Sequence, residues 1–394
     1  MGMVKGALEG LRVLESTVQI AGPYCGRLLG ELGAEVIKVE PLSGEASRRS
    51  PPFYNGAPLL YLYSNANKKS IALNLKDERG QKVFTDLAEK SDILVVNYRP
   101  GVMERLGLGY EVLKKKNKGL IYVSITGFGY SGKHSSYAGY DMLAQAMSGL
   151  ADANGDPSGV PKINSMTLDY SAAMMAATAA LAAVINRERT GQGQFIDISL
   201  QDVGMVYVQH LIGQYLCGMR YRSGNRRLAF APFSVYPTLD GYAVVAIDED
   251  SRWEAFLKAI GKESATKDET LKNVELRVRN YDQVDKLVSE WAKGLKTEEV
   301  VRIVTSAGGA SCPVKKVSEV IDDEHLKARQ MLGTMNSPVY GDVPYVGSVF
   351  KMSETPGSID SLGPQLGADT QAILTQVLGY SENKVATLRS EGVV

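Results

Sequence analysis

The chain has 394 residues with 44 basic and 44 acidic side chains, so its formal net charge is zero and no basic excess points to nucleic-acid binding. Its length exceeds that of one ordinary core, and two domains are expected. The three cysteines and three histidines are dispersed, which excludes a disulfide framework, predicts no metal site and favours a reducing, cytoplasmic location.

The first half of the chain alternates strand and helix patterns. "LRVLEST" and "EVIKVEP" are typical of strands, and "AGPYCGRLLGELGA" between them of a turn and short helix. Further strands are expected at "SIALNL", "DILVVNYRPG" and "GLIYVSITGFG", with an amphipathic helix from about Asp77 to Lys90. Strands that alternate with helices predict an α/β fold with a large doubly wound, Rossmann-like parallel sheet.

The stretch "NSMTLDYSAAMMAATAALAAVI" places Asp169 just ahead of an apolar helix. One interpretation is helix capping, in which the carboxylate accepts hydrogen bonds from the first turn. The other is chemistry, because a helix N-terminus favours an ionised and therefore nucleophilic carboxylate. The apolar run from Ala172 to Ile185 is too short to span a bilayer, and no signal peptide is visible, so we expect a buried helix and no membrane association.

The second half of the chain has a different pattern of predicted strands, turns and helices. After about Tyr221 come short strand patterns, a tight turn at "LDG", a helix at "SRWEAFLKAIG" and a solvated helical stretch, which together predict a smaller α+β domain. From about Gln330 the chain is punctuated by Pro and Gly and is expected to be irregular, ending in a short helix near Asp369 to Leu378. The predicted divisions are a large domain at 1–200, a linker at 201–224, a small domain at 225–330 and a segment at 331–394 that returns to the large domain or wraps a partner subunit.

Basic residues recur near the predicted strand ends, at Lys38, Lys76, Arg99 and Arg105. The carboxyl ends of parallel strands converge on one crevice, where several cations could hold phosphates. Each could also be an ordinary surface charge. The nearby "GFGYSG" satisfies neither common nucleotide-binding motif in full and is better explained as a turn after a strand.

Several ordered segments together resemble the class III CoA-transferase (CaiB/BaiF) family, which includes formyl-CoA transferase and carnitine CoA-transferase. They are "VQIAGPYCGRLLGELGAEVIKVEP", "NKKSIALNLKDERGQKVF", "DILVVNYRPGVMERLGLGYEVL", "SITGFGYSG", "YDMLAQAMSGL" and "RTGQGQFIDISLQD". The resemblance continues through "CPVKKVSEVIDDEHLKARQML" and covers nearly the whole chain.

The resemblance implies a set of site residues. The family's catalytic aspartate falls on Asp169, and Gln19 would donate a hydrogen bond to an acyl or anhydride oxygen. Pro41 stands where some members carry a basic residue, so Lys38, Arg48 or Arg49 would have to supply the phosphate contact on that side. The CoA-binding positions are Ala21, Lys38, Leu73, Asn74, Leu75, Lys76, Asn97, Tyr98, Arg99 and Arg105.

The resemblance also implies an activity. Members move CoA from an acyl-CoA to a carboxylic acid through an aspartyl–acyl anhydride and an aspartyl-CoA thioester, without a metal, and form interlocked homodimers. "APFSVY" stands where the formyl- and oxalyl-CoA enzymes have a glycine-rich loop, which argues against oxalate. The acyl donor and acceptor cannot be read from the sequence.

Two alternatives share features with this interpretation. An α-methylacyl-CoA racemase of the same fold needs two proton-transfer groups, supplied in that family by a histidine and an aspartate. Here Tyr140 in "GYDML" occupies the position of that histidine, and His134 lies six residues upstream. A non-catalytic CoA-binding protein is the other alternative, disfavoured by the presence of Asp169.

Overall fold

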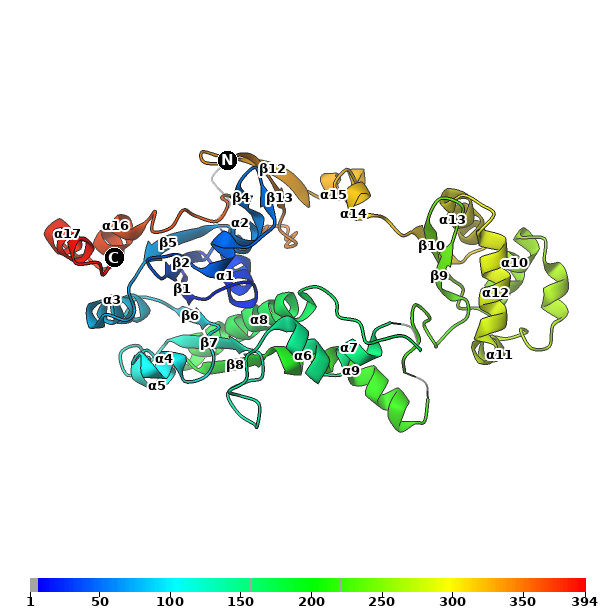
Figure 1. The fold of residues 1–394 in the computed structure, drawn as a ribbon, viewed down its shortest axis with the longest axis horizontal. Helices are drawn as coiled ribbons and strands as arrows, with labels where there is room; N and C mark the ends of the chain where they lie inside the picture. Colours follow the sequence, from blue (N-terminus) through cyan, green and yellow to red (C-terminus); the bar gives the residue numbers. More distant parts are fainter. Residues whose placement is uncertain (1–5, 156–157, 220) are drawn as a thin grey trace. The chain divides into compact units, whose positions relative to one another are not determined.

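The computed structural model describes residues 6–155, 158–219 and 221–394 (Figure 1). Within these residues the chain forms two compact units. Unit 1 takes its residues from Met1–Leu150, Ile163–Gln209 and Glu324–Val394, and unit 2 from Ala151–Lys162 and His210–Asp323.

Unit 1 is built on a six-stranded parallel sheet. The strands are β1 (Arg12–Ser16), β2 (Glu35–Glu40), β5 (Lys68–Ala72), β6 (Ile93–Val96), β7 (Ile121–Thr126) and β8 (Phe195–Ser199). They lie in the order β5-β2-β1-β6-β7-β8, and every neighbouring pair is parallel. The order reverses between β1 and β6, which is the arrangement of dinucleotide-binding folds. The predicted α/β fold with a large parallel sheet is confirmed.

Helices cover both faces of this sheet. On one face α1 (Ala21–Glu31) and α8 (Thr167–Thr190) pack against the strands and against each other. A second core joins Leu14, Ile37 and Leu94 of the strands to α3 (Glu78–Glu89), α5 (Tyr110–Leu113) and α17 (Glu382–Ser390). Two-sided burial explains why "ILVV" in β6 is an unbroken apolar run.

Unit 1 also contains several shorter helices and strands. η1 follows β2, α4 follows β6, and α6 packs against α8. The bounds are η1 (Ala46–Arg49), β3 (Phe53–Tyr54), β4 (Ala57–Pro58), α2 (Leu59–Ser64), α4 (Val102–Arg105), α6 (Asp141–Met147) and α15 (Glu324–Ala328).

The last segment of the chain contains more regular structure than predicted. β12 (Leu332–Ser337) and β13 (Gly341–Val346) form an antiparallel hairpin, so the prediction of an irregular stretch is wrong here. Pro344 pairs with Thr334 in this two-stranded ribbon, where a strand edge tolerates proline. The predicted short helix corresponds to α16 (Thr370–Ala372) and η3 (Ile373–Val377), and α17 was not predicted.

Unit 2 is a small α+β domain. Its sheet has the order β11-β10-β9, and Thr238 N–H donates to the Gly241 carbonyl at 2.9 Å across the predicted "LDG" turn. A separate core contains Trp253, Phe256, Val284 and Val288. The elements are β9 (Phe233–Pro237), β10 (Tyr242–Ala246), α10 (Asp250–Ala259), η2 (Glu263–Lys267), α11 (Val274–Arg279), α12 (Tyr281–Ala292), α13 (Thr297–Ser306), β11 (Ala310–Pro313) and α14 (Val317–Val320).

The boundaries of the units differ from the predicted ones. Most of the predicted linker at 201–224 is a helix, α9 (Leu200–Leu216), because its apolar residues follow directly from β8 without a turn signal. Ala151–Lys162, which includes most of α7 (Leu150–Ala153), groups with unit 2. Glu324–Val394 groups with unit 1.

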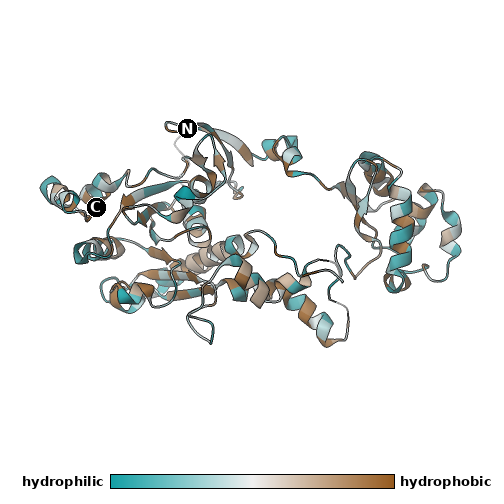
Figure 2. Ribbon diagram, in the orientation of Figure 1, coloured by the Kyte–Doolittle hydropathy of each residue, from teal (hydrophilic) through white to brown (hydrophobic). Residues whose placement is uncertain are grey.

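The central turns of helix α8 carry apolar residues on all sides. It is the one helix of the described residues that is long and apolar enough to cross a membrane by length and composition, with a mean hydropathy of 1.6 over its most apolar window. Half of that window is buried inside unit 1, where its alanines meet α1, β7 and β8. Its other side exposes Met174, Met175 and Ile185. Figure 2 shows hydrophobic residues along both α8 and α9.

Candidate active site

A pocket lies at the carboxyl edge of the parallel sheet, where the strand order reverses. It has a volume of about 480 Å³. Ligands of doubly wound sheets bind in such a crevice because the loops after the strands converge there. The lining residues are Ser16, Val39, Glu40, Pro41, Leu42, Ser43, Leu73, Asn74, Leu75, Lys76, Tyr98, Val102 and Leu106.

Five of the residues that the resemblance assigns to CoA binding line this pocket: Leu73, Asn74, Leu75, Lys76 and Tyr98. The leucines and the tyrosine ring extend the core on that face of the sheet, so the pocket has an apolar floor. An apolar floor with a few polar groups at the rim suits a flat heterocycle.

The loop from Leu73 to Lys76 is held by backbone hydrogen bonds. Leu73 N–H donates to the Glu40 carbonyl at 2.8 Å, and Asn74 N–H donates to the Val393 carbonyl at 2.9 Å. Gln81 Nε2 donates to the Leu75 carbonyl at 3.0 Å. The loop is therefore fixed from the strand side, from α3 and from the last residues of the chain.

Three of the predicted cations have free, exposed side chains. Lys76, Arg99 and Arg105 are exposed, and none of them has an ion-pair partner among the described residues. Arg49 is also exposed, and its Nη1 donates to the carbonyl of Ser43 on the pocket rim at 2.8 Å. Arg48 forms an ion pair with Glu40, with an Nη2–Oε1 distance of 2.6 Å.

Lys38 has a different environment from the one predicted. Its side chain has no exposed surface, and its ammonium lies 3.1 Å from Glu15 Oε1 and donates to the Thr17 carbonyl at 3.1 Å. The carboxylates of Glu15, Glu45 and Glu40 raise the pKa of Lys38 against the opposing effect of its burial. The prediction that Lys38 contacts CoA phosphates is therefore not supported by its position, because its ammonium is fully buried and paired with Glu15.

Gln19 lies in the turn between β1 and α1, and Ala21 is the buried first residue of α1. Asn97 follows β6 and reaches this same turn. Val18 N–H donates to Asn97 Oδ1 at 2.9 Å, and Asn97 Nδ2 donates to the Val18 carbonyl at 2.8 Å. The turns after two neighbouring strands are thus joined by one side-chain amide.

Asp169 lies in the first turn of α8. The helix begins at Thr167, after Met166 in a left-handed conformation, so Asp169 is the third helical residue and not the cap. The capping group comes from α6: Asp141 Oδ2 accepts hydrogen bonds from Leu168 N–H at 2.6 Å and Asp169 N–H at 3.1 Å. The capping interpretation of Asp169 is therefore wrong. The sequence did not single out Asp141, because it lies 27 positions before Leu168 and no local pattern links the two residues.

The carboxylate of Asp169 has no hydrogen-bond donor within the described part of the chain. Burial raises the pKa of Asp169 to about 7, with a further contribution from the negative charge of Asp141. The expectation that the helix start keeps this group fully ionised is not met, since burial and then the charge of Asp141 raise its pKa. A strongly perturbed, unpaired carboxylate is typical of a functional group.

The first turns of α8 and α1 lie side by side. Tyr170, next to Asp169, packs edge-on against Tyr24 of α1 with ring centroids 4.8 Å apart. Tyr24 is in the first turn of α1, which follows Gln19. The structure thus brings together the start of α8, which carries Asp169, and the start of α1, which follows Gln19.

Tyr140 and His134 are the two positions considered for the histidine of a racemase. Tyr140 is 65% exposed at the start of α6. His134 packs among the rings of Phe128 and Tyr137, with centroid separations of 6.2 and 4.8 Å. Its ring is part of an aromatic cluster in the loop after β7.

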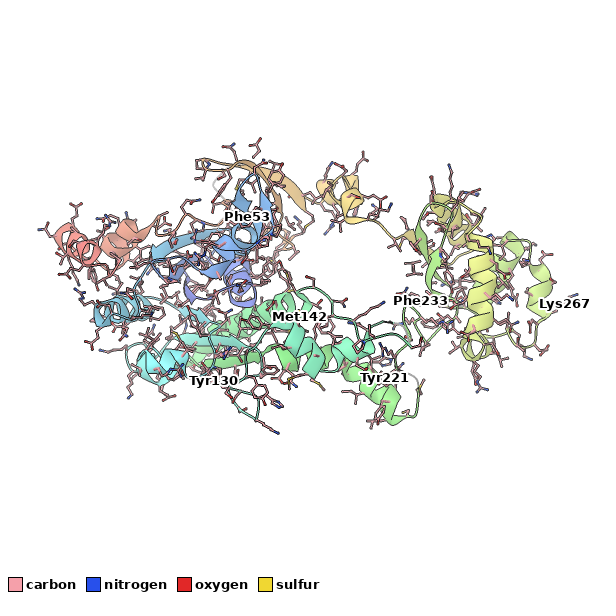
Figure 3. All side chains as sticks on the ribbon, in the orientation of Figure 1. Phe53, Tyr130, Met142, Tyr221, Phe233 and Lys267 are labelled. Carbon is pink, nitrogen blue, oxygen red and sulfur yellow. The ribbon has the colours of Figure 1, made fainter. Side chains whose placement is uncertain are left out.

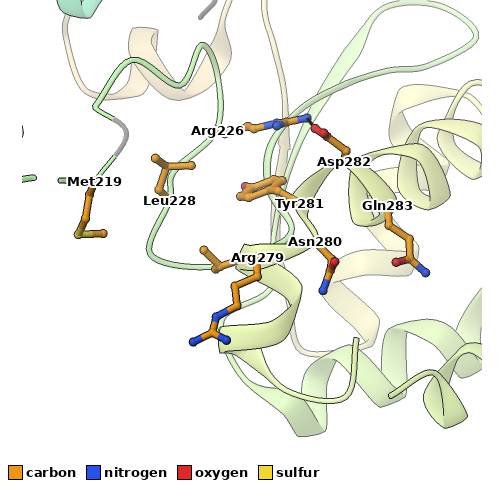
Figure 4. A pocket seen from close by; sticks show the side chains of 9 residues that line it. Met219, Arg226, Leu228, Arg279, Asn280, Tyr281, Asp282 and Gln283 are labelled. Atoms are coloured by element: carbon orange, nitrogen blue, oxygen red, sulfur yellow. Dashed lines mark hydrogen bonds and ion pairs between the residues drawn. The ribbon is translucent and has the colours of Figure 1, made fainter. Parts of the chain in front are cut away.

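Unit 2 has a pocket of its own (Figure 4). Arg226 lies over the ring of Tyr281 at 4.9 Å and is paired with Asp282 at 2.5 Å and Asp285 at 2.7 Å. Two carboxylates neutralise this guanidinium, so it is not a free anion-binding group.

Comparison with known proteins supports the same interpretation. The profile of CoA-transferase family III matches residues 8–370. The chain is 34% identical over 398 residues to the succinyl-CoA–L-malate CoA-transferase beta subunit of Chloroflexus aurantiacus, covering 98% of both. It is 34% identical over 392 residues to the succinyl-CoA:glutarate CoA-transferase of Mus musculus, covering 98% of this chain and 90% of that protein.

A solved structure gives the same result. The crystal structure of a CaiB/BaiF family protein from Brucella suis matches with a TM-score of 0.85 and 31% identity, covering 95% of this chain and 100% of that one. The family resemblance of the sequence is thereby confirmed along almost its whole length. The chain belongs to CoA-transferase family III and is an enzyme of that class.

Proposed function

We propose that this enzyme transfers CoA from succinyl-CoA to a small carboxylic acid through a covalent intermediate on Asp169. The observation that carries the proposal is the carboxylate of Asp169, which is partly buried, has a raised pKa and lacks a hydrogen-bond donor among the described residues. A carboxylate used only for structure would be paired, because an unpaired buried charge costs free energy.

The nucleotide end of CoA would occupy the pocket at the carboxyl edge of the sheet. The apolar floor formed by Leu73, Leu75 and Tyr98 would take the adenine ring. The phosphates would be held by charge-assisted hydrogen bonds from exposed cations. Lys76, Arg99 and Arg105 are free for this role, and Arg49 is placed at the Ser43 rim of the pocket.

The chemistry begins when the Asp169 carboxylate attacks the thioester carbonyl of the donor. The C–S bond breaks, giving an aspartyl–acyl anhydride and CoA thiolate. The thiolate attacks the aspartyl carbonyl, which releases the donor as a free carboxylate and leaves an aspartyl-CoA thioester. Two steps replace one difficult exchange, as in other covalent catalysis.

The second half of the reaction repeats these steps in reverse with the acceptor. The acceptor carboxylate attacks the aspartyl thioester, releases CoA thiolate and forms a new anhydride. The thiolate then attacks the acceptor's acyl carbon, which gives the product thioester and returns Asp169 as a carboxylate. Gln19 would donate a hydrogen bond to the oxygen that gains charge in each addition.

The names of the relatives suggest the substrates. Relatives that are 31–34% identical act on succinyl-CoA with malate, citramalate, glutarate or mesaconate. We therefore infer that succinyl-CoA is the donor. The acceptor class is a dicarboxylate of about four or five carbons, similar in size to the acceptors of those relatives. A screen of dicarboxylates with succinyl-CoA identifies the acceptor.

We also infer that two copies of the chain associate through the open side of α6, α8 and α9. Ser171 of α8 and Tyr207 of α9 share a hydrogen bond of 2.6 Å, so these helices form one surface. A large apolar patch on a folded unit marks an interaction surface. Its exposed residues include Met142 (Figure 3), Met147, Met174, Met175, Ile185, Met205, Val206 and Tyr207.

The decisive experiment traps the intermediate. Enzyme incubated with succinyl-CoA and hydroxylamine should yield an aspartyl hydroxamate in the peptide that contains Asp169, read by mass spectrometry. Asp169→Asn should abolish both transfer and the adduct while CoA still binds. Asp248→Asn, which changes a carboxylate paired with Arg252 on the surface, is the matched control and should behave as wild type.

Other outcomes would contradict the proposal. Full activity in Asp169→Asn, or turnover without an adduct at this residue, would exclude the covalent mechanism. Exchange of the substrate's α-proton into deuterated water without acyl transfer would indicate a racemase. For the association, Met175→Asp should give a monomer by sedimentation, and Val112→Asp on the exposed side of α5 should not.

A further inference from the structure

The backbone of Gln19 has an unusual conformation. Its φ is +66°, in the left-handed region that residues other than glycine rarely adopt. Such a conformation persists only when surrounding contacts impose it, and it is often found at functional sites. The groups that hold this turn therefore determine where the Gln19 side chain is presented.

Two side chains from other parts of unit 1 hold the turn. Asn97 bonds both polar groups of Val18, at 2.9 and 2.8 Å. Glu45, which is 2% exposed, accepts a hydrogen bond from Gln19 N–H at 3.3 Å. The backbone groups on either side of the Val18–Gln19 bond are thus fixed by a carboxamide and a buried carboxylate.

Glu45 is itself held in place. It caps η1 by accepting from Ser47 N–H at 2.9 Å and from the Ser47 hydroxyl. Its Oε1 lies 4.0 Å from the ammonium of Lys38, which also bonds the Thr17 carbonyl at 3.1 Å. Lys38 therefore links the carboxylate beside Gln19 to the backbone two residues earlier.

The charged side chains beneath the turn are paired with one another. Lys38 and Lys68 both pair with Glu15, at 3.1 and 2.6 Å, and all three side chains have no exposed surface. Gly22 completes the arrangement, because a Cβ there would lie 2.5 Å from the Thr17 side chain and 3.1 Å from that of Asn97. The turn cannot relax without disturbing a fully buried set of ion pairs.

We propose that Glu45 is a positioning residue for Gln19, and that with Asn97 it holds the strained turn so that the Gln19 amide meets the developing oxyanion. This inference rests on the proposed function of Gln19. Pre-positioned donors stabilise a transition state far more than mobile ones, because no reorganisation is needed when charge develops. Glu45 lies outside the CoA pocket, so its effect should be on kcat rather than on CoA affinity.

The test is a double-mutant cycle with succinyl-CoA and an acceptor dicarboxylate. Glu45→Ala, which removes the acceptor of the Gln19 N–H bond, should lower kcat about tenfold and leave KM for succinyl-CoA within about twofold. Glu45→Gln keeps an oxygen acceptor and should recover most of kcat. In a Gln19→Ala background, which lacks the amide, Glu45→Ala should lower kcat by less than about twofold.

The cycle also separates this inference from the proposed function. Additive effects of Glu45→Ala and Gln19→Ala on kcat, or a kcat for Glu45→Ala equal to wild type, would overturn the positioning role. If Glu45→Ala does not fold, Asn97→Ala on the half-buried side of the turn is put through the same cycle. A wild-type enzyme without the Asp169 hydroxamate would refute the mechanism itself, whereas Glu45→Ala should still form that adduct, more slowly.

Discussion

Asp141 caps the helix that carries Asp169, because its Oδ2 atom accepts hydrogen bonds from the backbone N–H of Leu168 and Asp169 at 2.6 and 3.1 Å. The two carboxylates near this helix N-terminus therefore have different roles. Asp141 takes the hydrogen bonds and is buried, while the side chain of Asp169 has no donor among the described residues. This division leaves the Asp169 carboxylate without a hydrogen bond from the helix it belongs to.

The pH dependence of catalysis should follow from this arrangement. The pKa of Asp169 is raised to about 7, first by burial and then by the charge of Asp141. Because the proposed nucleophile is the Asp169 anion, kcat/KM for succinyl-CoA should rise with pH through about 7 and level off above it. A pH–rate profile with a stable acceptor dicarboxylate measures this. A profile that stays flat through neutral pH would contradict it.

Stability should depend on pH in the opposite direction. A carboxyl group whose pKa is raised on folding binds more protons in the folded state, so its stabilising effect is present in acid and is lost as pH rises through about 7. Asp169→Asn, which cannot ionise, should therefore raise Tm above neutral pH and change it little in acid. Thermal unfolding of both proteins at two pH values checks the sign, with Asp248→Asn as the control. An equal change at both pH values would be inconsistent with ionisation.

Asp141→Asn separates the charge of Asp141 from its capping role. The amide oxygen can still accept from the first turn of α8, but the negative charge beside Asp169 is gone. The pKa of Asp169 should fall, so the acidic limb of the kcat/KM profile should move to lower pH. Asp141→Ala should instead cost about 1–2 kcal/mol of unfolding free energy, since the first turn loses its acceptor. An unmoved limb in Asp141→Asn would show that burial alone sets the pKa.

Lys38 should be a structural residue. It is fully buried with Glu15, so Lys38→Met leaves a carboxylate with one fewer partner and should lower the free energy of unfolding by about 3–5 kcal/mol. Lys69→Met, on the same strand pair but with 52% of its side chain exposed, should cost about 0–1 kcal/mol. Urea denaturation compares the two. Equal, small costs for both variants would leave Lys38 available for another role.

The exposed cations should govern CoA affinity. Replacing Lys76, Arg99 or Arg105 by Met should raise KM for succinyl-CoA about tenfold each with kcat nearly unchanged, because the lost phosphate contact is remote from the reacting carbonyl. Added salt should weaken wild-type binding more than that of the variants. Lys69→Met is the control, since Lys69 is exposed but paired with Glu35. A fall in kcat at constant KM would place the residue near the chemistry instead.

The sequence by itself determined the sheet. The central strands β6 and β7 are largely apolar and fully buried, as strands covered on both faces must be. The alternation of strands with helices leaves few topologies open. The order of motifs also identified the family and Asp169, because these are local patterns in the chain. Five of the assigned CoA positions line the pocket for the same reason, since loops after parallel strands converge at one edge.

Other features depended on contacts between distant residues, which no local pattern encodes. Lys38 and Lys76 are both lysines near strand ends, yet one is buried against Glu15 and the other is exposed at the pocket. The hairpin of β12 and β13 exists because its residues pair with each other despite Pro344. Only the tertiary structure brought Asp141 to the start of α8 and Glu45 beneath Gln19, because hydrogen bonds across 27 and 26 positions depend on packing of the whole unit.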